Sequence, residues 1–148
     1  MADPDFKNRA HELRARLDAF RETEALAGVA VDELFTGLKR ACACVDAPRP
    51  ELSGADRLNP QHWGYGLYVY FRDRILIGCA ILPADTWEPR KNLLHAEVSM
   101  EYPRPLKTLT LERTAPSSAE WKSEGRRIEP EAFFLDLLEG YADRWAGE

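Results

Sequence analysis

Cysteine and histidine are the residues best suited to hold a metal, and their spacing here argues against a metal site. Cys42 and Cys44 lie one residue apart in a segment of helical periodicity, while His62 and Cys79 are distant in the sequence. Thiolates and imidazoles bind zinc, but two residues spaced in this way on a helix point about 200° apart. We therefore predict reduced cysteines and no metal, with Cys42 and Cys79 as small apolar core residues.

A second candidate for chemistry is the strand face that carries His95 and Glu97. Such a pair can exchange protons with a substrate. Covalent catalysis would also need a nucleophile from elsewhere in the chain, and a polar row on an alternating strand is typically just solvated. We predict no catalytic residues. A small-molecule binder or enzyme that uses a pocket near His95 and Glu97 is an alternative.

The sequence also lacks the motifs of the common cofactor-binding sites. Asp85, Glu88, Glu97 and Glu101 lack the spacing of a divalent-cation motif. The glycines of residues 64–66 precede a strand and lack the third glycine of the dinucleotide fingerprint, which has to follow a strand. No cofactor is expected.

Composition narrows the class of protein. The chain has 148 residues, a formal net charge of −5 and 45% hydrophobic residues, which fits one globular domain over residues 1–148. The negative charge argues against nucleic acid as a partner. An acidic N-terminus and the lack of an apolar run of about 20 residues argue against export or membrane insertion, so a cytoplasmic location is expected.

The most informative stretch is residues 64–82, which reads as a hairpin that is apolar on both faces. A three-residue turn places the isoleucines on one core face and leaves Tyr68 and Tyr70 beside Gly78 and Ala80. A turn of even length mixes the tyrosines with the isoleucines instead. We favour the first register. Its tyrosine face is either a binding platform or is covered by a loop or a terminal helix.

The surrounding elements indicate an α+β fold in two layers. Helical periodicity covers residues 5–25, where Phe6, Leu13, Leu17 and Phe20 share a face, and residues 30–44, with Gly28 between them. Two helices or one bent helix fit this pattern. A long loop follows over residues 45–64. Ser117 and Glu120 fit a capping box that opens a helical turn.

We therefore predict two N-terminal helices, a four-stranded antiparallel meander and a C-terminal helix that starts at Pro130. On its apolar face this last helix carries Phe134, Leu137, Leu138, Tyr141 and Trp145.

The function that fits these observations is non-enzymatic binding of a macromolecule, most plausibly another protein. Inhibitors, immunity-type proteins, adaptors and chaperones are the relevant classes. Exposed aromatic residues supply contact area, and acidic groups match a basic partner. The predicted partner-binding residues are Trp63, Tyr68, Tyr70, Trp87, Glu97 and Glu101. A homodimer that buries the aromatic face is a further alternative.

Overall fold

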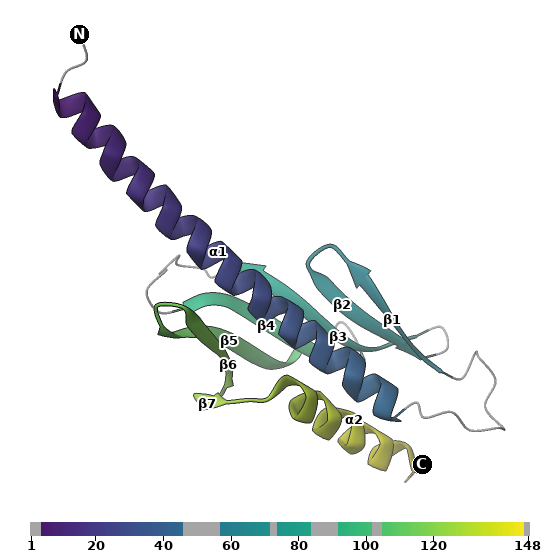
Figure 1. Cartoon of the computed structure of the whole chain (residues 1–148). Coiled ribbons are helices and arrows are strands. Elements are labelled where there is room, and N and C mark those ends of the chain that lie inside the picture. The colour runs from purple at the N-terminus through teal and green to yellow at the C-terminus, as the bar shows by residue number, and fades with distance from the viewer. Residues whose placement is uncertain (1–3, 46–56, 72–73, 84–91, 102–104, 147–148) are drawn as a thin grey trace.

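The computed structural model describes residues 4–45, 57–71, 74–83, 92–101 and 105–146, and shows an α+β fold (Figure 1). The chain begins with a 42-residue helix, α1 (Pro4–Val45). Seven strands follow, β1 (Leu58–Trp63), β2 (Gly66–Phe71), β3 (Arg74–Pro83), β4 (Asn92–Met100), β5 (Pro105–Ala115), β6 (Ser118–Ser123) and β7 (Arg126–Arg127), and then α2 (Pro130–Ala146). Each strand pairs antiparallel with the next one in the sequence, so the predicted fold class and meander are confirmed.

The prediction of two N-terminal helices is wrong, since α1 is one continuous helix. Gly28 lies within α1, is exposed, and has open space at the position that a Cβ would occupy. One glycine inside a helix costs about 1 kcal/mol relative to alanine. This cost is small enough for α1 to run through the position without a break.

The described part of the sheet has three strands more than the four that we predicted. β1 lies in the segment expected to be a loop, and as an edge strand it accommodates Pro60. The capping box at Ser117 and Glu120 is wrong, since residues 118–123 form β6 and Trp121 lies opposite Leu111 of β5. Pairing with β5 satisfies the backbone groups that a helical turn would have satisfied.

The β2–β3 hairpin has the register that we favoured over most of its length. Leu67 lies opposite Cys79, and Tyr68 lies opposite Gly78. The register then shifts by one residue after Val69, as in a β-bulge, so the end of the hairpin follows the other register. The isoleucine face and the tyrosine face are therefore separate, as expected, except next to the turn.

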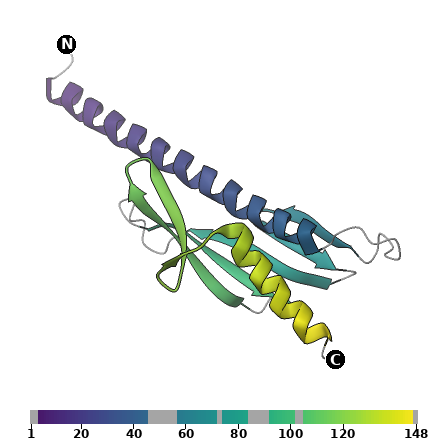
Figure 2. The same ribbon diagram turned by 60° about the horizontal axis from the view of Figure 1, so that its bottom comes forward.

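Both helices lie on the isoleucine face of the sheet, where they pack against each other (Figures 1 and 2). The indole Nε1 of Trp121 on β6 donates a hydrogen bond to the backbone oxygen of Ala30 on α1, at 2.8 Å. The ring of Phe35 on α1 meets His62 of β1 edge-on. The fully buried side chains between the layers include Leu34, Leu38, Leu67, Val69, Ile77, Cys79, Val98, Leu109, Leu111 and Phe134.

The three cysteines occupy very different environments. Cys42 and Cys79 are buried, as predicted for core residues, whereas Cys44 is exposed near the end of α1. Burial raises the pKa of the Cys79 thiol from 9.0 to about 12, so at neutral pH this group is a neutral thiol and a poor nucleophile.

We expect a thiol reagent such as DTNB at neutral pH to modify Cys44 promptly in the native protein, and all three cysteines only after unfolding. The absorbance of the thiolate released from the reagent measures the number of modified cysteines. The C44S variant should show almost no prompt reaction, and prompt reaction of a second thiol would contradict the burial of the other two.

Candidate interaction surfaces

The N-terminal half of α1 extends beyond the sheet. Every residue from Pro4 to Glu22 is exposed, and we call this segment the arm. At 1.5 Å per residue the arm is roughly 28 Å long. Figures 1 and 2 show it leaving the body of the molecule in the direction that α1 already has. The arm is therefore a helix supported by the fold at one end.

The arm ends at Thr23, the first buried residue of α1, at 4% exposure. The Thr23 hydroxyl donates to the backbone oxygen of Ala19 at 3.0 Å and accepts from Nη2 of Arg113 on β5 at 2.6 Å. Nη1 of Arg113 donates to the backbone oxygen of Pro116 at 2.9 Å. The two bonds of Arg113 connect α1 to the end of the β5–β6 hairpin at the point where the arm begins.

Large apolar side chains line one side of the arm. Phe6 is 65% exposed, Leu13 57% and Leu17 48%. With Ala10 and Phe20 they cover about 80° of the helix circumference, and we call these five residues the arm stripe. Soluble monomers rarely expose contiguous apolar patches of this kind without a function.

Basic residues border the arm stripe on both sides. Lys7, Arg14 and Arg21 follow one border, and Arg9 and Arg16 follow the other. The long apolar stems of these residues extend the apolar surface, while their charged ends define a positive rim.

The acidic residues of the arm lie on the opposite side of the helix. They are Asp5, Glu12, Asp18 and Glu22. Asp18 lies next to the rim, with its Oδ1 3.9 Å from Nη1 of Arg21, and both side chains are exposed. The arm thus places its basic residues next to the apolar stripe and its acidic residues farther back.

A second surface is the sheet face that points away from both helices. Strand pairing places Trp63, Gly66, Ala80 and Glu97 in one row across β1 to β4. Trp63 is 60% exposed. The Tyr68 ring lies over Gly66, where an added Cβ would be 2.8 Å from its Cε2 atom. Of the predicted partner-binding residues, Trp63, Tyr68 and Glu97 thus share this face, with Trp63 and Glu97 three strands apart.

The other predicted residues are placed differently. Tyr70 is half-buried and lies opposite Asn59, two residues along β2 from Tyr68. Glu101 follows β4 with a φ of 53° and accepts a hydrogen bond from the Tyr141 hydroxyl of α2 at 2.7 Å, so it connects the sheet to α2. Trp87 lies outside the described residues.

His95 and Glu97 share the open face of β4 and are both half-buried. A groove of about 950 Å³ lies elsewhere, between α1 and the start of α2, where Val29, Gly37 and Leu135 are among the lining residues. Neither His95 nor Glu97 lines it, so this groove does not support a role for the pair in catalysis.

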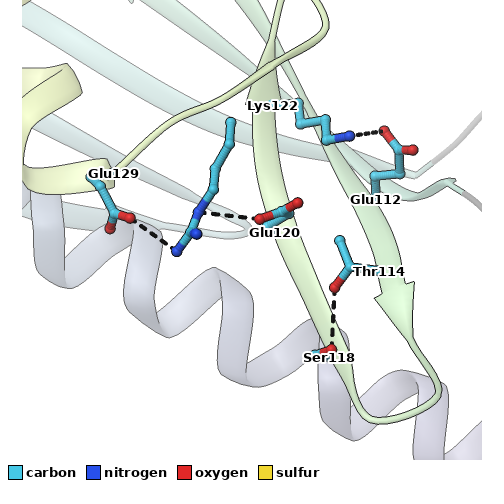
Figure 3. Close-up of polar contacts among 7 residues, drawn as sticks. Glu112, Thr114, Ser118, Glu120, Lys122 and Glu129 are labelled. Carbon is cyan, nitrogen blue, oxygen red and sulfur yellow. Dashed lines mark hydrogen bonds and ion pairs between the residues drawn. The ribbon is translucent and has the colours of Figure 1, made fainter.

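The polar rim of this groove is occupied by internal ion pairs. Arg127 contacts Glu120 at 3.1 Å and Glu129 at 3.0 Å, and Figure 3 shows the two carboxylates on either side of one guanidinium. Arg40 lies 3.9 Å from Glu131 across the same groove. The lining also includes Asp32 and Glu33, so four carboxylates face two guanidinium groups and the groove is acidic. The arm, with its row of large exposed apolar side chains, is the stronger candidate for a protein interface.

Within the described ranges, no three His, Cys, Asp or Glu residues are grouped in a way that would hold a metal ion. None of the helices in the part of the chain that the structure describes is long and apolar enough to cross a membrane. Comparison with family models, curated proteins and solved structures finds no match for this chain, so geometry alone supports the functional argument.

Proposed function

We propose that this chain is a non-enzymatic module that binds another protein, with the arm as its main contact. One observation carries the proposal, namely that Phe6, Leu13 and Leu17 are half to two-thirds exposed on one side of a helix that the fold supports. An amphipathic helix with apolar residues at this spacing is a common way to occupy a groove on a partner protein.

The attachment at Thr23 favours this use of the arm. Because the body of α1 is packed against the sheet and α2, the arm starts from a fixed helical end. A binding helix that is already formed loses less conformational entropy on association than a disordered segment. An inhibitor, adaptor, immunity-type protein or chaperone module would benefit from such an arm.

The open sheet face offers a second contact area for the same function. Trp63, Tyr68 and Glu97 share this face, with Tyr70 two residues along β2 from Tyr68. Tryptophan and tyrosine supply large, stiff contact area, and they are frequent among the residues that dominate binding energy. We assign this face a supporting role, since most of its other residues are polar or small.

The test compares two charge-matched variants of the full chain in capture experiments from cells that express it. L13E/L17E places two carboxylates on the arm stripe, whereas N8E/A15E adds the same charge on the back of the arm. The wild type and N8E/A15E should capture the same proteins in similar amounts. L13E/L17E should capture at least about tenfold less of them, as expected for loss of a binding hot spot.

All four substituted positions are exposed, so both variants should keep the wild-type thermal midpoint within about 2 °C. Quantitative mass spectrometry of the captured proteins is the measurement. Equal capture by the two variants would refute the arm as the contact.

A further inference from the structure

We propose that the partner presents an acidic amphipathic helix, which pairs with the arm along the arm stripe and places Asp or Glu residues next to the basic rim. This inference rests on the proposed function and names the chemistry of its partner.

The spacing of the arm stripe is that of a helix-pairing seam. Phe6, Leu13 and Phe20 recur every seven residues, and Ala10 and Leu17 form the second row between them. Apolar residues that alternate in steps of three and four pack into the holes of a facing helix.

The same seam continues into the folded half of α1, where it is covered. The seven-residue row extends through Ala27 and Leu34, and the second row reaches Leu38 after Glu24 and Val31. Ala27, Leu34 and Leu38 are buried against the rest of the fold, at 8%, 0% and 0% exposure. The row that the fold buries in one half of α1 and leaves exposed in the other indicates that the exposed half is also a packing surface.

The charges beside the seam specify the partner. In heptad terms Phe6, Leu13 and Phe20 are d positions, and Ala10 and Leu17 are a positions. The e positions are then Lys7, Arg14 and Arg21, and the g positions of the arm include Arg9 and Arg16. Because e and g residues face those of the paired helix and set partner choice, five basic residues at these positions select a helix with acidic e and g residues.

These charges argue against a second copy of the arm as the occupant. In a parallel pair e residues face g residues, and in an antiparallel pair each kind faces its own. Either arrangement of two arms would bring arginine or lysine next to arginine or lysine along the whole contact. Like charges at such positions disfavour pairing.

A membrane surface fits the arm less well than a helix does. The five basic residues of the arm are offset by Asp5, Glu12, Asp18 and Glu22, so the attraction of the whole arm to anionic lipid is weak. The arm stripe is also narrow, about 80° wide, which suits one facing helix better than the broad apolar face of an interfacial helix. A partner helix paired along the arm stripe would contact the individual residues of the basic rim, and the acidic back of the arm would face solvent.

The probe is a synthetic peptide of about three heptads with leucine at a and d and glutamate at e and g. Its glutamates repel one another, so the free peptide does not pair with itself. The matched control peptide carries lysine at the same e and g positions. Fluorescence anisotropy of each labelled peptide is measured against the full-length wild-type protein, L13E/L17E and N8E/A15E.

We expect the glutamate peptide to bind the wild type and N8E/A15E at least about tenfold more tightly than it binds L13E/L17E, and more weakly as salt is raised. The lysine peptide should bind at least about tenfold more weakly than the glutamate peptide. Equal binding of the two peptides, or no binding of either, would overturn the inference.

Two further measurements test whether a lipid surface or a second copy of the chain covers the arm stripe instead. Sedimentation with vesicles of phosphatidylcholine and phosphatidylserine should leave the protein in the supernatant, and light scattering should give the mass of a monomer. Vesicle binding or self-association that L13E/L17E abolishes would assign the arm stripe to lipid or to a second copy, and would overturn the acidic-helix inference. If no glutamate-peptide binding is seen while L13E/L17E still loses its captured proteins, the proposed function stands and only this inference fails.

Discussion

Replacing Gly37 with alanine is expected to lower the free energy of unfolding by about 2–3 kcal/mol. Gly37 lies where α1 meets the first turn of α2. A Cβ at this position would be 2.5 Å from Cβ of Pro130 and 2.8 Å from the backbone nitrogen of Glu131. Because backbone atoms block the space, α2 would have to move away from α1. The helix-propensity gain of about 1 kcal/mol is smaller than this cost.

Gly28 supplies the matched control within the same helix. Nothing lies within 4 Å of a Cβ built there, so G28A gains helix propensity without a clash. We expect G28A to raise the free energy of unfolding by about 0.5–1 kcal/mol. Urea denaturation followed by circular dichroism measures both variants, and the thermal midpoint of G37A should fall by roughly 5–10 °C. If G37A is as stable as G28A, α1 and α2 do not approach this closely at Gly37.

The parts of the fold that the sequence predicted correctly are those that depend on short-range periodicity. The hairpin register that we favoured places Leu67 and Ile77 on one core face, and the structure buries both residues completely. The final helix begins at Pro130, and its Phe134 and Leu138 are buried as expected. In each case the residues themselves carry the pattern, so no distant contact was needed to interpret it.

The errors arose where a local signal competed with tertiary structure. Gly28 suggested an interruption of the first helix. The packing of α1 on the sheet and α2 outweighs the cost of a glycine inside a helix, which is about 1 kcal/mol. Ser117 and Glu120 matched a capping box, yet β5 offers a full set of backbone partners and the sheet buries Trp121. Residues 45–64 were expected to form a loop, although an edge strand such as β1 tolerates the proline at position 60.

The same distinction between local patterns and tertiary contacts applies to the candidate surfaces. The amphipathic pattern of the arm was visible in the sequence, but periodicity reveals only that a face is apolar and does not reveal what covers it. The grouping of Trp63, Tyr68 and Glu97 depends on the register of four strands, which the sequence of a single hairpin does not determine. Glu101 was selected as an exposed acid, and its bond to Tyr141 could not be foreseen because it joins residues 40 positions apart.

Substitution of Trp121 should have the largest effect on stability of the changes considered. Trp121 is 3% exposed on β6, and its indole donates to the backbone oxygen of Ala30 at 2.8 Å. W121A removes this bond and leaves a cavity between the sheet and α1, so we expect a loss of about 3–5 kcal/mol in the free energy of unfolding. W121F keeps most of the ring volume and should lose about 1–2 kcal/mol.

Urea denaturation of the three proteins separates the two contributions, since W121F reports mainly the hydrogen bond and W121A reports bond and packing together. A loss below about 1 kcal/mol for W121A would mean that the other contacts of α1, with α2, Arg113 and His62, keep it in place without Trp121. The anchors at Ala30 and Gly37 are about 10 Å apart along α1 and contact different elements, β6 and α2. The effects of W121F and G37A should therefore add to within about 0.5 kcal/mol in the double variant, whereas a clear deviation would show that one anchor positions α1 for the other.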